Sequence, residues 1–278
     1  MNADPLALLA AVPGALADDA ARGHVRDAAG VLPASSGGGF ECHLGDPGRV
    51  DLSVRLDGYG PLGAPFLTWL ERDAGAAATG RYDGVPAGPH RTRPPALPGP
   101  DGWVRAAAEV RGAALPRAAE ARLRGCLAGL PGGAWPTWVG ALPGRDGDVR
   151  LTANGLTAAT LATYLAGFPS DVVAGAVALA ATVPAVAVHL DVGAELGPAV
   201  GVEVVVSPRR TATLAAALLA GAGRDPAPAA AVTRWPGVTV VAGVRVVRRV
   251  NHLKVVLRPG EPPRPKAYLY YGALGGAA

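Results

Sequence analysis

Short runs in which apolar and polar residues alternate recur along the chain, and this period of two is typical of strands with one buried face. The runs come in pairs around turn-forming residues. FECHL and VDLSVRL flank GDPGR, PTWVGAL and DVRLTANGL flank PGRDG, and AVAVHLDV and AVGVEVVV flank GAELGP. A fourth pair lies within Arg248–Gly272 and turns at PGEPP. The pattern therefore predicts four β-hairpins.

Segments that favour helices separate these hairpins. The first predicted helix, residues 5–29, is interrupted by helix-breaking residues at Pro13 and Gly14. The order helix, strand, strand, helix thus repeats about four times, without sequence identity between the repeats. The predicted helices cover residues 5–29, 64–76, 115–130, 157–168, 171–183 and 210–222.

Residues 74–102 are rich in Gly, Pro and Arg and predict a long loop. Because the element order before this loop resumes after it, we expect one domain over residues 1–278 rather than two domains joined by a linker. The segment after the loop, WVRAAAEV at residues 103–110, fits either the remnant strand of a fifth repeat or a helix.

Each predicted hairpin has an apolar face and a polar face with ionisable side chains. Because alternate residues of a strand share a face, the polar residues can be assigned. The four polar faces carry Glu41 and His43 with Asp51, Ser53 and Arg55; Arg150, Thr152 and Asn154; His189 and Asp191 with Glu203; and His252, Lys254 and Arg258 with Arg264, Lys266, Tyr268 and Tyr270. A turn centred on Pro47 and Gly48 places Glu41 opposite Arg55.

The apolar faces of the hairpins need helices to cover them, which leaves two arrangements for the polar faces. An open antiparallel sheet exposes them to water. A closed barrel gathers them inside and removes the edge strands that an open sheet exposes. We expect the second arrangement, an α+β fold in which repeated α-β-β-α units form a closed antiparallel β-barrel with a polar interior and helices outside.

Composition and charge narrow the class of protein. Half of the 278 residues are hydrophobic, with 39 Gly and 27 Pro, a bias typical of GC-rich bacterial genomes. The formal charge is +4 and the sequence pI is about 9.4, but the basic residues are spread along the chain, which argues against a nucleic-acid partner. The only cysteines, Cys42 and Cys126, lack metal-ligand spacing, so a disulfide framework is excluded and a cytoplasmic location is expected.

Two stretches bear on membranes and secretion. The N-terminus lacks the basic region of a secretory signal. Residues 172–188 are uncharged, but they are short for a membrane span and Pro184 interrupts them. We therefore expect no membrane insertion, and a monomer or a weak dimer.

Common catalytic motifs are missing from the sequence. It contains no GxGxxG after a strand, no P-loop, no GxSxG, no HExxH and no CxxC. These absences predict no cofactor for the protein. The pair His189 and Asp191 shares a face, but a lone strand histidine is more often hydrogen-bonded than metal-bound, so we predict no metal site.

The repeated α-β-β-α order resembles that of the αββα-barrel ("ABBA") aromatic prenyltransferases. Glu41 in FECHL and Arg55 in VDLSVRL resemble the acidic residue and the arginine on the first strands of the fungal members. Lys266-Ala-Tyr268 resembles their Lys-x-Tyr motif, and Lys254 is the expected cross-strand neighbour. The resemblance implies a closed barrel and the transfer of a prenyl group from an allylic diphosphate to an aromatic or peptide acceptor.

Prenyl transfer gives the polar residues separate roles. Arg55, Lys254, Lys266 and Arg150 would neutralise the diphosphate as it leaves. Tyr268 and Tyr270 would stabilise the allylic cation through their aromatic faces. Glu41 would accept the proton of the acceptor or orient the acceptor.

Other features of the sequence favour different functions. The second and third hairpins lack Lys-x-Tyr, and the third offers carboxylates, at Asp191 and Glu203, that would repel a diphosphate unless Mg²⁺ bridges them. With His189, His43 and His252 these groups suit acid–base catalysis, such as cyclisation of a modified lanthipeptide-type peptide or of a small molecule, without zinc-binding cysteines. A third possibility is a non-catalytic module that binds a hydrophobic ligand or a partner enzyme.

Overall fold

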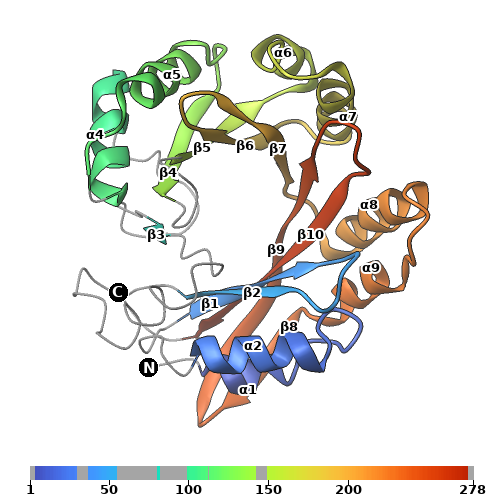
Figure 1. Ribbon diagram of the computed structural model, residues 1–278. Coiled ribbons are helices and arrows are strands. Elements are labelled where there is room, and N and C mark those ends of the chain that lie inside the picture. The colour runs from blue at the N-terminus through green and yellow to red at the C-terminus, as the bar shows by residue number, and fades with distance from the viewer. Residues whose placement is uncertain are drawn as a thin grey trace. The chain divides into compact units, whose positions relative to one another are not determined.

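A computed structural model describes residues 4–29, 37–54, 80–81, 99–111, 113–141 and 149–274 (Figure 1). The chain divides into two compact units, each of which is described by itself below. Unit 1 comprises residues 1–72, 205–256 and 262–278, and unit 2 comprises residues 73–204 and 257–261. Most of the loop predicted at 74–102 and the helix predicted at 64–76 lie outside the described residues.

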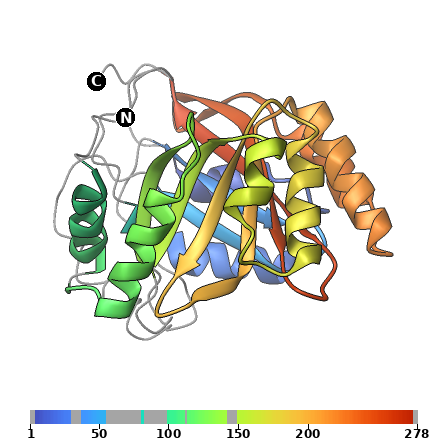
Figure 2. The ribbon, with the colours of Figure 1, turned by 90° about the horizontal axis from the view of Figure 1, so that it is seen from above.

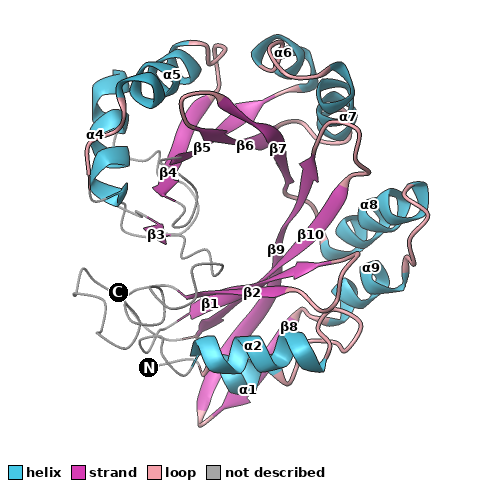
Figure 3. Cartoon of the chain, in the orientation of Figure 1, coloured by secondary structure: helices cyan, strands magenta, loops and turns pink. Residues whose placement is uncertain are grey.

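Unit 1 is built on antiparallel strands in the order β2-β1-β10-β9, with β8 paired to the first half of β9. Helices precede and follow these strands in the chain, and α8 packs against β10 (Figure 3). The elements are α1 (Pro5–Leu9), α2 (Asp19–Ala29), β1 (Gly37–His43), β2 (Val50–Val54), α8 (Pro208–Gly221), α9 (Ala227–Ala231), β8 (Gly237–Val241), β9 (Val244–Leu257) and β10 (Arg264–Ala273).

The core of unit 1 lies on the apolar face of its strands, as the alternation predicts. Phe40 of β1 packs edge-on against Trp235, with ring centres 5.9 Å apart, and both side chains are fully buried. The Trp235 indole N–H donates to the carbonyl oxygens of Arg249 and Tyr270, at 3.2 and 3.1 Å. Trp235 therefore joins the segment after α9 to both long strands, β9 and β10.

The N-terminal helix predicted over residues 5–29 is two helices in the structure. α1 ends at Leu9 and α2 begins at Asp19, on either side of the break predicted at Pro13. Arg22 of α2 explains the stability of this break, because its guanidinium donates to the carbonyl oxygens of Leu9, Val12 and Ala17 at 2.6–3.2 Å. These carbonyls lie outside a continuous helix and need such donors.

Unit 2 repeats the combination of antiparallel strands and helices. Its strand order is β7-β6-β5-β4-β3, and α6 and α7 lie next to each other (Figure 2). Residues 103–110 belong to a helix, α4, and are not a remnant strand. The elements are β3 (Gly80–Arg81), α4 (Gly99–Arg111), α5 (Arg117–Ala128), β4 (Trp135–Ala141), β5 (Val149–Leu156), α6 (Ala158–Tyr164), α7 (Ser170–Ala180), β6 (Val186–Val192) and β7 (Leu196–Val204).

The prediction of a closed barrel is wrong. The antiparallel sheet is open: strand pairing ends at β2 on one side and at β3 on the other, and within the described ranges no pairing joins these two strands. A strand with one apolar and one polar face fits an open sheet as well as a closed one, so the alternation could not decide between them. Closure would have required pairing partners for both end strands. The prediction of a single domain stays a prediction.

The described helices are all too short or too polar to cross a membrane.

Candidate functional site

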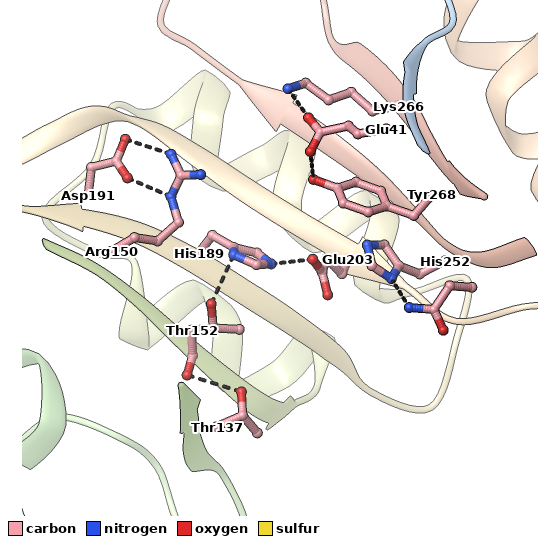
Figure 4. A network of polar contacts seen from close by, with 11 residues as sticks. Glu41, Thr137, Arg150, Thr152, His189, Asp191, Glu203, His252, Lys266 and Tyr268 are labelled. Atoms are coloured by element: carbon pink, nitrogen blue, oxygen red, sulfur yellow. Dashed lines mark hydrogen bonds and ion pairs between the residues drawn. The ribbon is translucent and has the colours of Figure 1, made fainter. Parts of the chain in front are cut away.

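The polar face of β1, β10 and β9 in unit 1 gathers most of the residues that the fourth hairpin was predicted to contribute. Strand register places Glu41 opposite Tyr268, and Tyr268 opposite His252. One step along, His43 lies opposite Lys266, which lies opposite Lys254. This set of side chains is called the Glu41 cluster below, and Figure 4 labels Glu41, His252, Lys266 and Tyr268 of it.

The register of β1 with β2 differs from the predicted one. Glu41 lies opposite Asp51, not opposite Arg55. The turn is tighter than expected, because the amide of His43 already donates to the carbonyl of Arg49. The hairpin is thereby centred on Asp46 instead of on Pro47 and Gly48. Arg55 lies outside the described residues.

Glu41 is the centre of the cluster. Its Oε1 accepts a hydrogen bond from Lys266 Nζ at 2.5 Å, and its Oε2 accepts one from the Tyr268 hydroxyl. Burial opposes ionisation of this carboxyl, but the charges of Lys266 and Lys254 and the two hydrogen bonds outweigh burial and lower its pKa to about 2. Glu41 is therefore a carboxylate at any physiological pH.

The two lysines of the cluster are the only lysines in the sequence, which has 26 lysine and arginine residues together. The fold brings them directly opposite each other on β9 and β10. Lys254 is buried, with 5% of its surface exposed. The rarity of lysine is a signal in the sequence, but strand alternation does not reveal it, because lysine and arginine are equally polar in that pattern.

Aromatic rings cover the next positions of the same face. The Tyr268 ring stacks on His252 with 4.0 Å between ring centres, and Nδ1 of His252 is 3.1 Å from the side-chain amide of Asn251. A shift of register follows at Tyr268, after which Tyr270 lies opposite Arg249. The Arg249 guanidinium carbon is 4.5 Å from the centre of the Tyr270 ring, a cation–π contact.

Three side chains at the edge of the cluster have the chemistry of metal ligands. His43 Nε2 is 3.7 Å from Glu41 Oε1 and 3.3 Å from Asp51 Oδ2, and the ligand atoms of all three residues lie within 4.8 Å of one another. The Lys266 ammonium bonds the same Glu41 oxygen, so a cation there would have to displace it. The prediction that the protein has no metal site stays a prediction.

Unit 2 has a polar face of its own, on β5, β6 and β7. Arg150 lies opposite Asp191, and its guanidinium donates to both carboxylate oxygens, at 2.7 and 3.1 Å. Both side chains are largely buried. The ion pair holds both side chains in place, and the catalytic role predicted for Asp191 stays a prediction.

His189 is the chemically versatile residue of unit 2. Its Nδ1 is 2.9 Å from the hydroxyl of Thr152, and its Nε2 is 2.6 Å from a carboxylate oxygen of Glu203. The Trp138 ring meets the imidazole at 63° with ring centres 5.3 Å apart, so Trp138 lies on the same polar face. The predicted proximity of Glu203 to His189 is confirmed. Thr152 was placed on this face but not recognised as a partner of the histidine.

No protein-family model matches the chain, and no curated protein is significantly similar to it.

Proposed function

We propose that this protein is an enzyme that transfers a prenyl group from an allylic diphosphate to an aromatic or peptide acceptor, at the Glu41 cluster. The observation that carries the proposal is the placement of the only two lysines of the chain, Lys254 and Lys266, across from each other. Both positive charges act on Glu41, and a multiply charged anion would be attracted by both lysines at once. Diphosphate is such an anion, and lysine binds phosphate groups as a compact positive charge.

The first step of the proposed reaction is ionisation. The bond between the allylic carbon and the diphosphate oxygen breaks, and its electron pair leaves with the diphosphate. Groups fixed where this charge develops lower the barrier, and removal of one such group typically costs about 100-fold to 1,000-fold in rate. Lys254 and Lys266 would supply this charge.

The allylic cation needs an electron-rich surface without a strong nucleophile. Tyr268 and Tyr270 lie on the same face as the lysines, and Tyr270 already holds the guanidinium of Arg249 over its ring at 4.5 Å. A cation over an aromatic ring gains roughly 2 kcal/mol when water is excluded. The tyrosines would therefore shield the cation until the acceptor attacks it.

Glu41 would orient the acceptor rather than deprotonate it. A carboxylate whose pKa is about 2 is a weak base at neutral pH. It is, however, a strong hydrogen-bond acceptor for an N–H or O–H group of the substrate. The proton released by the acceptor would pass to water or to the departing diphosphate.

A binding measurement tests the proposed diphosphate site. We would record the thermal unfolding of the protein with dimethylallyl, geranyl and farnesyl diphosphate, with and without Mg²⁺. A ligand present at 100 times its Kd should stabilise the fold by about 2.7 kcal/mol. Lys254→Met should remove this stabilisation, whereas Tyr268→Phe should keep it, because the aromatic ring remains. Arg117→Met, on the exposed start of α5, controls for the loss of one positive charge.

If none of the three diphosphates stabilises the wild-type protein, prenyl transfer is contradicted. Equal stabilisation of the wild type and of Lys254→Met would show that the diphosphate binds elsewhere.

A second candidate function is acid–base catalysis on a peptide or a small molecule, as in a cyclase. His189, held between Thr152 and Glu203, favours it, because an imidazole that bonds a hydroxyl and a carboxylate can move a proton between them. A base or acid of this kind must change its protonation near neutral pH. NMR of imidazole-labelled protein, assigned with His189→Gln, should then show His189 titrating between about pH 5 and 8. An imidazole that does not titrate in this range would rule out the role.

A further inference from the structure

We propose that the edge strand β8 is a docking surface for an extended, acidic segment of a partner protein, which adds to the sheet as a further strand. The docking surface consists of Val238 and Val240 on β8 with Arg245 and Val247 on β9. The inference goes beyond prenyl transfer and does not depend on it.

β8 has one paired side and one open side. It pairs with the start of β9 from Gly237, opposite Arg248, to Val241, opposite Val244, and in the part of the chain that the structure describes no second strand pairs with it. The backbone N–H and C=O groups along the other side of an edge strand form a template for another strand. A short turn at Ala242 and Gly243, both with positive φ, holds β8 against β9.

The side chains of β8 are unusual for an unprotected edge. Val238 is 52% exposed and Val240 is 64% exposed, and neither a proline nor a charged residue interrupts the strand. Natural edge strands usually carry such residues to prevent pairing with other chains. The two valines share a face with the partly buried Val247, opposite Val238. Together they offer apolar contacts to alternate side chains of a docked strand.

The positive charge of the residues around β8 favours an acidic partner. No aspartate or glutamate occurs between Asp225 and Glu261, whereas this stretch contains five arginines. Arg245 is exposed and lies opposite Val240, on the face that carries the two valines. An acidic side chain on a docked segment would meet the guanidinium group of Arg245. A second copy of this chain would bring like charges together, which disfavours self-pairing through β8.

The docking surface also lies on the functional face of unit 1. Arg245 shares a face of β9 with Arg249, which lies opposite Tyr270 of β10. Alternate side chains of a segment docked on β8 therefore point to the side of the sheet that carries the Glu41 cluster.

A labelled probe peptide tests the proposal. The probe is a ten-residue peptide that alternates glutamate with threonine and carries fluorescein, and its counterpart has lysine in place of glutamate. Fluorescence anisotropy should show binding of the acidic peptide alone, weakened about 10-fold between 50 and 300 mM salt because exposed charges are screened. Amides of residues 237–241 should gain protection from hydrogen exchange when the peptide binds.

Substitutions identify the surface. Arg245→Glu should weaken binding of the acidic peptide about 10-fold or more, since it replaces attraction by repulsion. Arg117→Glu makes the same charge change on the exposed start of α5 and should leave binding unchanged. Binding of both peptides alike, protection away from β8, or β8 amides already protected by dimerisation of the protein alone would each overturn the proposal.

Discussion

The carboxylate of Glu41 shows how one ionisable group can be fixed in a single protonation state. Burial alone would favour its neutral form, but two lysines and a tyrosine hydroxyl favour the charged form more strongly. Because the folded protein holds the pKa of Glu41 at about 2, below its ordinary value of 4.5, ionised Glu41 stabilises the fold above pH 4.5. The difference corresponds to roughly 3 kcal/mol.

This contribution should disappear as the pH falls from 4.5 towards 2. We predict that over this range the free energy of unfolding falls by roughly 3 kcal/mol more in the wild type than in Glu41→Gln. Urea unfolding at a series of pH values measures the difference. Glu120→Gln, on the surface of α5, serves as the control and should keep the wild-type slope. A Glu41→Gln protein with the wild-type slope would contradict the assigned environment of Glu41.

Two tyrosines differ in whether their hydroxyl is satisfied. The hydroxyl of Tyr271 is buried and has no hydrogen-bond partner among the described residues, whereas that of Tyr164 donates to the carbonyl of Cys126 at 3.3 Å. A buried hydroxyl without a partner costs about 1–3 kcal/mol. Tyr271→Phe should therefore stabilise the protein by about 1 kcal/mol and Tyr164→Phe should destabilise it by about 1 kcal/mol. Chemical denaturation of both variants measures the two changes in stability. Changes of the same sign would contradict the hydrogen-bonding states described for the two hydroxyls.

Much of the candidate site follows from the sequence at the scale of residues. Alternation alone put Glu41, Lys254, Lys266 and Tyr268 on polar faces, and the fold brings these four side chains together. Alternation could not identify the residue opposite Glu41 on the next strand. Moving the centre of the turn by two residues shifts the pairing by four, which replaces Asp51 with Arg55. Nor could pairing across non-consecutive strands, such as β1 with β10, be derived from patterns local to each hairpin.

At the scale of elements, the β8–β9 hairpin carries a local strain. Its two-residue turn needs positive φ at both positions, and Ala242 adopts φ 47° next to Gly243 at φ 79°. Turns of this kind favour Asn-Gly, because alanine in a left-handed conformation costs roughly 1 kcal/mol. The strain is local to the turn, since the strands on either side pair without interruption.

Ala242→Asn should therefore raise the free energy of unfolding by about 1 kcal/mol. Ala10→Asn provides the control, because Ala10 is exposed and has an ordinary right-handed backbone with φ −60°. Thermal unfolding monitored by circular dichroism compares the two. A stability gain at both positions, or at neither, would contradict the assignment of strain to Ala242.

The elements themselves were largely predictable, because strand alternation and helix breaks are local. Strands β4 to β7 and helices α5 to α8 lie within a few residues of their predicted positions. The separation of α1 from α2 was predictable only in part. Pro13 indicates a break in the helix, but the hydrogen bonds that stabilise the break come from Arg22 of α2 and could not be predicted from the local sequence. Strand order and closure depend on contacts between distant segments and were not predictable from local patterns.

On the scale of the whole molecule, each compact unit contains one cysteine. Cys42 of unit 1 is fully buried on β1, and burial raises the pKa of its thiol. Cys126 of unit 2 is half-buried on α5. A buried thiol reacts only when the structure around it opens, and an opening that costs about 3 kcal/mol slows the reaction about 100-fold.

We therefore predict that Cys126 reacts with a disulfide reagent at least about 100-fold faster than Cys42 in the native protein. Cys42→Ala and Cys126→Ala proteins separate the two rates, and in urea both thiols should react at the same fast rate. Fast labelling of Cys42 in the native protein would show that β1 is not packed as described.

The central claim is that Lys254 and Lys266 form a site for an allylic diphosphate, and release of diphosphate from geranyl diphosphate tests it most directly. This release needs no knowledge of the acceptor, because water can trap the cation. The wild type should release diphosphate well above the rate in buffer, and Lys254→Met and Lys266→Met should each be about 100-fold slower. Arg117→Met should match the wild type. A wild-type rate equal to that in buffer, or lysine variants as fast as the wild type, would contradict the claim.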